Sequence, residues 1–274
     1  MESLPPLLVS IVRTLLTQIP LLLVVLGGAW LFLRNRFAER HRVYRLPFGK
    51  GQLASELSSA VLIITYSSVS TALQFSAGHL RLGEPGWGNT LVTFAVLFVL
   101  NEVWFYVSHR ALHSPALYFI HAQHHTARVV SPFTSFSFSL AEHVLTSVPA
   151  IWLMVLFSQL MPLSMPGVAA FSVLNILGTL LGHLNVELFP AGFARSAPGQ
   201  VFFSSTFHAL HHARYRGHYG LFTRIMDRLF GTEFPDYAEL QSAAARGQGL
   251  TALSARLPVE VAAPPQGPLA TRPQ

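Results

Sequence analysis

The sequence predicts an all-α integral membrane protein with about three spans, a shorter helical hairpin and a histidine-rich helical cap on the cytoplasmic side. Of its 274 residues, 51% are hydrophobic and only 11% are charged, whereas roughly 25% of a soluble domain is charged. The apolar residues form runs long enough to cross a bilayer core of about 30 Å. The chain also has 13 histidines and no cysteine, which excludes disulfides and iron–sulfur clusters held by this chain.

The N-terminal region, residues 1–90, is expected to hold membrane spans and a basic cytoplasmic loop. A first apolar run covers 4–33, and a second covers 53–75. The loop between them, 34–51, is rich in arginine, so the positive-inside rule places it in the cytoplasm. A cleaved signal peptide is the rival interpretation, but its apolar core would be shorter and would follow basic residues.

The remaining apolar runs predict a third span and a hairpin. The run 90–107 returns the chain to the cytoplasmic side, and 144–160 and 168–181 form the hairpin. Each hairpin run is close to the lower length limit for a span, so a re-entrant hairpin is the open alternative. With this topology every histidine cluster lies on the same side of the membrane.

Neither the net charge nor the C-terminal segment indicates a specific function. The net charge is +6, but the basic residues flank apolar runs, where they set topology and meet anionic lipid rather than nucleic acid. The C-terminal segment, 233–274, ends in a proline-rich stretch from 258 onward, which we expect to be disordered and without a chemical role.

Histidine motifs are the strongest functional signal. Residues three or four apart share a helix face, so each motif is expected to present its imidazoles on one side. Neutral imidazole is a common metal ligand. Finding the pattern His-x-x-His-His twice by chance has odds on the order of a few in ten thousand, which favours a metal site over isolated buried histidines. The candidate ligands are His109, His113, His121, His124, His125, His208, His211 and His212.

These motifs resemble the fatty acid hydroxylase and sterol desaturase superfamily of membrane di-iron oxygenases. The match continues through the ending Tyr-Gly and Met-Asp-Arg-Leu-Phe-Gly-Thr, at 219–220 and 226–232. The resemblance covers 91–232, which we therefore expect to be the catalytic domain. It implies two iron ions, O2 as co-substrate, and hydroxylation or desaturation of a lipid such as a sterol, fatty acyl or isoprenoid chain. It also adds His183, after the last apolar run, as a ninth ligand.

The sequence departs from the family pattern near the end of the ligand set. Many members have a His-Pro-x-Glu motif where this chain reads Ser-Leu-Ala-Glu, ending at Glu142. The asparagine of the family's Asn-Tyr-Gly is His218 here, and its tryptophan is Met226. Either His143, beside the altered motif, or His218 is therefore a candidate for the last ligand.

Three carboxylates are candidates to support the ligands: Glu102, Glu142 and Asp227. Glu102 lies inside an apolar span, where an ionisable group is energetically expensive and usually functional. A carboxylate that accepts a hydrogen bond from a ligand imidazole fixes its orientation. The alternatives are that Glu102 pairs with a polar neighbour, and that Asp227 forms a surface ion pair with Arg228.

The chemistry predicted for this site needs electrons from outside the chain. The sequence has no dinucleotide, flavin or haem-binding motif, so we expect a separate ferredoxin or cytochrome b5-type donor. Two other functions remain open. A zinc-dependent membrane hydrolase would use Glu142 or Glu187 to act on water, and a metal-binding or transport protein would perform no reaction.

Overall fold

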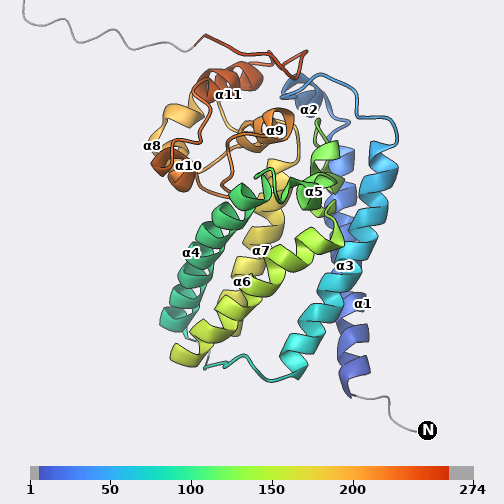
Figure 1. The fold of residues 1–274 in the computed structure, drawn as a ribbon, viewed down its shortest axis with the longest axis vertical. Coiled ribbons are helices and arrows are strands. Elements are labelled where there is room, and N and C mark those ends of the chain that lie inside the picture. The colour runs from blue at the N-terminus through green and yellow to red at the C-terminus, as the bar shows by residue number, and fades with distance from the viewer. Residues whose placement is uncertain (1–5, 85, 259–274) are drawn as a thin grey trace, which may run out of the picture.

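The computed structural model describes residues 6–84 and 86–258 of the chain. Long helices run lengthwise through the molecule, and short helices gather at the end opposite the N-terminus (Figure 1). Five of the helices are long and apolar enough to cross a membrane, which confirms the predicted all-α membrane fold. The long helices are α1 (Pro6–Phe32), α3 (Gln52–Ser76), α4 (Trp87–Leu112), α6 (Leu140–Leu160) and α7 (Met165–Gly182).

The two helices of the hairpin are longer than the sequence predicted. The α6 helix begins at Leu140, because the Ser139 hydroxyl accepts a hydrogen bond from the Glu142 N–H at 3.0 Å and caps the helix. The α7 helix follows with Pro166 in its first turn, where a missing N–H is tolerated. At 21 and 18 residues, both helices are long and apolar enough to be candidate spans.

The bundle is arranged in pairs. The α1 helix packs along α3, α4 packs along α7, and α6 contacts both α3 and α4. Gly167 allows the start of α7 to approach α4, because a Cβ there would lie 2.7 Å from the Thr90 carbonyl oxygen. Small residues at such crossings allow close van der Waals packing between membrane helices.

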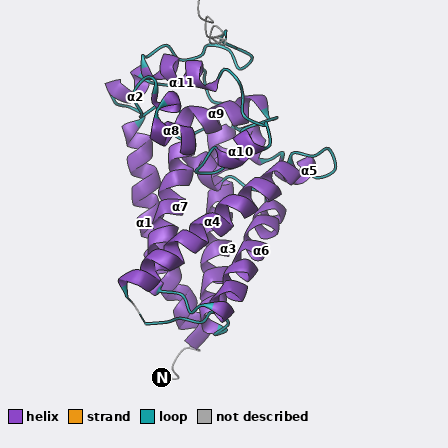
Figure 2. Cartoon of the chain, turned by 90° about the vertical axis from the view of Figure 1, so that its left-hand side faces the viewer, coloured by secondary structure: helices purple, strands orange, loops and turns teal. Residues whose placement is uncertain are grey.

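The cap has a hydrophobic core of its own. Phe207 and Leu210 of α9 pack with Tyr237 and Leu240 of α11, and Tyr44 from the loop after α2 joins the same cluster. The described part of the chain has isolated β-bridges but no strand (Figure 2). The short helices are α2 (Arg36–Arg40), α5 (Tyr118–His121), α8 (Ala197–Val201), α9 (Ser205–Arg214), α10 (Ile225–Leu229) and α11 (Tyr237–Ala245), with 3-10 helices η1 (His124–Thr126), η2 (Pro132–Phe136) and η3 (Phe193–Arg195).

Asn185 joins distant segments of the cap just after the last span. Its side-chain amide donates to the Tyr44 carbonyl at 3.0 Å and accepts from the Tyr44 N–H at 2.9 Å. Its φ of 55° lies in the left-handed region, which asparagine tolerates better than most residues. This contact fixes the chain directly after His183. The proline-rich tail predicted to be disordered lies outside the described residues apart from Pro258.

Candidate metal centre

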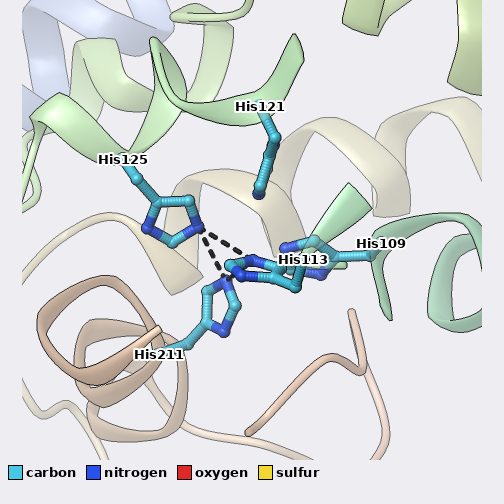
Figure 3. A group of neighbouring side chains, drawn as sticks. All are labelled: His109, His113, His121, His125 and His211. Carbon is cyan, nitrogen blue, oxygen red and sulfur yellow. Dashed lines mark hydrogen bonds between the residues drawn. The ribbon is translucent and has the colours of Figure 1, made fainter. Parts of the chain in front are cut away.

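The nine predicted histidines gather into two groups at the cap end of the bundle. Within each group the nitrogens that can bind a metal all lie within 4.8 Å of one another. All are buried except His113, which is half-buried. Figure 3 shows the first group, with its rings converging from separate elements. The five-histidine cluster contains His109, His113, His121, His125 and His211, and the four-histidine cluster contains His124, His183, His208 and His212.

The first His-x-x-His-His motif divides between the two clusters. His121 and His125 belong to the five-histidine cluster, whereas His124 belongs to the four-histidine cluster. The expectation that all three point one way is therefore wrong. His121 ends α5, and the other two lie in the 3-10 helix η1 rather than in a continuous α-helix.

The second motif divides in the complementary way. His208 and His212, one turn apart on α9, belong to the four-histidine cluster, and His211 belongs to the five-histidine cluster. Adjacent positions on an α-helix differ by about 100° in direction, so His211 and His212 face different clusters. Each motif thus contributes to both groups, and α9 lies between them.

In the five-histidine cluster, outer ring nitrogens are held by acceptors. His109 Nδ1 lies 2.9 Å from the Tyr219 carbonyl oxygen, and His211 Nδ1 lies 2.8 Å from that of Gly217. His121 Nδ1 lies 2.6 Å from a carboxylate oxygen of Glu142. These oxygens accept hydrogen bonds, so each Nδ1 carries the proton and leaves the Nε2 lone pair free for a metal.

The four-histidine cluster is held in the same way, by backbone carbonyls. His124 Nδ1 lies 3.1 Å from the Ser137 oxygen, and His212 Nδ1 lies 2.9 Å from the Ala127 oxygen. His183 Nδ1 lies 2.7 Å from the oxygen of Thr179, one turn earlier. The protein therefore fixes both the tautomer and the direction of these rings.

The inner nitrogens are spaced as ligands of metal ions would be. The Nε2 atoms of His183 and His208 are 3.0 Å apart, and that of His211 lies 3.1 Å from that of His125. Metal–imidazole bonds of about 2.1 Å at right angles place their nitrogens about 3 Å apart. Because His183 and His211 carry their protons on Nδ1, their inward Nε2 lone pairs are available to a metal ion. Among the described residues, the buried Nε2 atoms of His109, His121 and His212 have no hydrogen-bond partner.

Burial keeps the cap histidines in the neutral form that binds metals. Desolvation lowers the pKa of His183 to about 4. It also lowers the pKa of His208, His211 and His212 well below the ordinary value, and neighbouring histidines lower it further. The imidazoles are therefore in the neutral form at neutral pH, with one ring nitrogen free of a proton, and two ions would meet little competition from protons.

Of the three candidate carboxylates, Glu142 alone contacts a clustered histidine, through its 2.6 Å hydrogen bond with His121. Glu102 instead accepts hydrogen bonds from the backbone N–H groups of Phe222 and Thr223, at 3.0 and 2.8 Å. It was expected to reach an imidazole, but it leaves α4 toward the loop after Tyr219. Its effect on His109 therefore passes through the backbone.

Asp227 holds the same loop from the other side. It is fully buried and accepts hydrogen bonds from the N–H groups of Tyr219 and Gly220, at 2.8 and 2.6 Å. The alternative of a surface ion pair with Arg228 is wrong, because the Arg228 guanidinium donates to the Gln200 carbonyl at 3.0 Å. Asp227 positions the backbone that carries the acceptor for His109.

Neither candidate for the last ligand lies in a cluster. His143 Nε2 is 2.9 Å from the Ser67 hydroxyl, within the bundle. His218 is fully buried, and its Nδ1 lies 2.8 Å from the Phe207 carbonyl while its Nε2 accepts from the Phe234 N–H at 2.9 Å. Both rings have polar partners away from the clusters.

A cavity of about 380 Å³ opens from both clusters into the bundle. Histidines of the two groups line one end, and apolar side chains such as Phe105, Ile151 and Ile176 line its walls. Pockets with a few polar groups in mostly apolar walls are typical ligand sites. The site therefore combines metal-binding groups with space for an apolar molecule between membrane helices.

Comparison with known proteins identifies the family. The model of the fatty acid hydroxylase family matches residues 94–232. The chain belongs to the fatty acid hydroxylase family. No solved structure matches it.

The relatives of this fatty acid hydroxylase family member include plant proteins. Very-long-chain aldehyde decarbonylase GL1-1 of rice (Oryza sativa) is 30% identical over 246 residues, which is 83% of this chain and 39% of the relative. Protein CER1-like 1 of Arabidopsis thaliana is 34% identical over 142 residues, 48% of this chain and 21% of the relative. Very-long-chain aldehyde decarbonylase CER1 of the same plant is 30% identical over 157 residues, 54% of this chain and 24% of the relative. The chain thus spans well under half the length of these relatives.

Sequence reasoning missed two sets of groups at this site. The acceptors on Tyr219, Gly217 and Ser137 are backbone carbonyls, which leave no side-chain signal. The polar residues Asn101 and Ser147 line the cavity. Both could have been noticed in the sequence, because each interrupts an apolar helix.

Proposed function

We propose that this protein is an O2-dependent di-iron enzyme that oxidises a C–H bond of a membrane lipid. The observation that carries the proposal is the opening of both histidine clusters onto one cavity between membrane helices. Membership of the fatty acid hydroxylase family supports lipid as the substrate class. We extend the proposal to the chain's organisation, with region 91–232 as the catalytic part between segments 1–90 and 233–274.

The nine clustered histidines would hold the two ions, the five-histidine cluster one and the four-histidine cluster the other. Iron bound there would supply the one-electron chemistry that reduces O2 and removes hydrogen from an unactivated carbon. In a hydroxylation, the C–H bond, O2, two electrons and two protons give an alcohol and water. The two electrons would come from a separate ferredoxin or cytochrome b5-type donor.

The chain's own residues would orient the ligands and keep bulk water away. Glu142 holds the ring of His121, and Glu102 and Asp227 hold the loop that anchors His109. Apolar walls such as Phe105 and Ile151 would align a lipid chain and bring one carbon to the clusters. The arginine-rich loop supports a cytoplasmic cap by the positive-inside rule, where a soluble donor has access.

Aldehyde decarbonylation is a second candidate, favoured by the names of the plant relatives. It would split a long-chain aldehyde into an alkane one carbon shorter and a one-carbon fragment. The zinc hydrolase has less support. Glu187 is occupied by the Ser204 and Thr206 hydroxyls, each at 2.6 Å. One carboxylate oxygen of Glu142 holds His121, which leaves only its other oxygen to act on water.

Lipid mass spectrometry tests the proposal. Membranes that carry the protein, iron, O2 and a reductant should gain a lipid product that is absent from His124→Ala membranes. A gain of one oxygen indicates hydroxylation, a loss of two hydrogens desaturation, and an alkane one carbon shorter decarbonylation. Identical lipid profiles for the two proteins, with iron bound to the wild type, would refute an oxidative function. Product formation without O2 in a zinc-loaded sample would support the hydrolase instead.

A further inference from the structure

A second cavity of about 300 Å³ continues from the first toward the far end of the bundle. It is lined by residues of α3, α4, α6 and α7, among them Gln74, Leu97 and Val168. Leu97 is twelve residues before His109 on α4, so the two cavities extend about 18 Å along the helix axis. An extended lipid chain therefore fits along the line of the two cavities.

Polar side chains surround the junction of the two cavities. Asn101 of α4, Ser67 of α3, and His143 and Ser147 of α6 line both. Ser67 and His143 bond to each other at 2.9 Å. The Asn101 amide nitrogen and the Ser147 hydroxyl are buried and have no hydrogen-bond partner among the described residues.

Two unpaired polar groups at mid-membrane depth are energetically unfavourable unless a ligand satisfies them. A buried polar group without a partner costs roughly 1–3 kcal/mol, and an alkyl chain has no atom to offer. The Asn101 amide is a donor, and the Ser147 hydroxyl can donate or accept. Each can donate to an oxygen atom with lone pairs, such as a carbonyl or hydroxyl oxygen.

The charge of the cavities favours an uncharged group. No lysine or arginine of the described residues lines either cavity, and Glu142 lines the upper one. A carboxylate placed here would be desolvated without a lysine or arginine partner, which disfavours its ionised form. A free fatty acid is thus a poor match for this position.

We propose that the Asn101–Ser147 junction binds a neutral oxygen substituent of the lipid substrate, so that the enzyme acts on an oxygenated long-chain lipid at a carbon remote from that oxygen. Asn101 is eight residues before His109 on α4, which separates the junction from the metal centre by about 12 Å along the helix. When the oxygen is held there, the carbon that carries it lies far from the histidine clusters. The inference rests on the proposed lipid oxidation and favours attack on a distant C–H bond over chemistry at the oxygenated carbon.

Retention of matched lipids in nanodiscs tests the proposal without requiring turnover. The full chain is incorporated into phosphatidylcholine discs, incubated with octadecane, 1-octadecanol and octadecanoic acid, washed, and analysed by mass spectrometry against empty discs. Wild-type protein should retain the alcohol about tenfold more than the alkane, since each neutral hydrogen bond is worth about two- to tenfold in affinity. The acid should not exceed the alcohol.

Variants assign this preference to the junction. Asn101→Leu with Ser147→Ala should reduce the preference to about that of empty discs, and Ser147→Ala alone, which removes one oxygen, should reduce it partly. Ser172→Ala is the matched control, because this serine also lines the lower cavity but already donates to the Val168 carbonyl at 2.9 Å. Its preference should equal that of wild type.

The outcomes separate this inference from the proposed function. Equal retention of alkane and alcohol by wild type, a preference for the acid, or an unchanged preference in Ser147→Ala and the double variant would overturn the inference even if lipid oxidation occurs. A junction-dependent preference for the alcohol supports it even if no product forms. If product forms from 1-octadecanol, its new functional group should lie far from carbon 1, whereas oxidation at carbon 1 would overturn the inference.

Discussion

At the residue scale, the site depends on the second nitrogen of each imidazole. Six clustered histidines have Nδ1 within hydrogen-bond distance of a carbonyl or carboxylate oxygen. Five of these acceptors are backbone carbonyls, and one is the side chain of Glu142. The position of the main chain thus determines the direction of most ligands, and Glu142 is the acceptor that a single substitution can change.

Glu142→Gln should weaken metal binding. The neutral amide is a poorer acceptor than the carboxylate for the His121 N–H, and loss of such a partner typically lowers metal affinity by about 10- to 100-fold. Metal content after graded exposure to a chelator measures the effect. Glu56→Gln is the matched control, because Glu56 is equally buried but bonds to Thr134 at 2.7 Å rather than to a histidine. Equal metal loss in both variants would contradict the assigned role of Glu142.

His218 should make the cap sensitive to acid. Burial lowers the pKa of His218 well below its ordinary value, so the unfolded chain binds a proton more readily than the folded one. Its contribution to stability is present above the unfolded pKa of about 6.5 and is lost as pH falls below that value toward the lowered folded pKa. In that range His218 lowers the free energy of unfolding by about 1.4 kcal/mol for each pH unit of acidification.

The variant His218→Asn isolates that contribution. Asparagine tolerates the φ of 58° at this position and does not titrate. We expect a lower unfolding temperature at neutral pH, because the smaller side chain leaves part of the site empty. Between about pH 6.5 and pH 5, the unfolding temperature of the variant should fall less steeply than that of wild type. Parallel pH profiles for the two proteins, measured by thermal unfolding in detergent, would show that His218 does not titrate on unfolding.

At the element scale, the loop between α9 and α10 connects the candidate metal centre to the bundle. Its carbonyls at Gly217 and Tyr219 hold His211 and His109. Its N–H groups are held in turn by Asp227 and Glu102. Two buried carboxylates therefore support the ligands through one stretch of backbone.

Gly220→Ala should disrupt this loop. A Cβ at Gly220 would lie 2.4 Å from the Thr223 carbonyl oxygen and 2.9 Å from a carboxylate oxygen of Asp227, so the backbone must shift. We expect a loss of about 1–3 kcal/mol in stability together with lower metal content. Gly88→Ala is the control, because nothing lies within 4 Å of the added carbon on α4. Full metal content in Gly220→Ala would mean that the loop does not position the ligands.

At the scale of the whole molecule, the candidate metal centre joins the spans to the cap. The clustered histidines come from α4, α5, η1, the end of α7 and α9, and the cap core also includes Tyr44 and Leu250 from segments far apart in the chain. A metal ion that binds only the folded state stabilises that state by mass action. The bound ions should therefore contribute to the stability of the cap.

Metal removal should lower the thermal stability of the cap more than that of the bundle. Chelation leaves neutral imidazole lone pairs facing one another, whereas the spans keep their own packing. Hydrogen exchange measures this helix by helix. Backbone amides of α9 and α11 should exchange faster after chelation, with little change in α1 and α3. Restoring the metal should reverse the effect. Uniform destabilisation of all helices would argue against a separate contribution from the cap.

The sequence sufficed for the membrane fold and for the nine clustered histidines, because long apolar runs and repeated motifs are local signals. It did not give the division of those histidines, since that depends on a 3-10 turn at His124 and on where α9 lies. Nor could it place Glu102, whose partners are N–H groups of Phe222 and Thr223, more than a hundred residues away. Contacts between distant backbone atoms leave no trace in residue type.

The division of adjacent histidines between the two clusters has a consequence for how two metal ions would bind. His124 and His125 are joined by one peptide bond, as are His211 and His212, and in each pair one ring faces each cluster. An ion that orders one ring also orders its neighbour on the other side, so the second ion pays less conformational entropy. The two positions should therefore fill with positive cooperativity, as a pair rather than as independent sites.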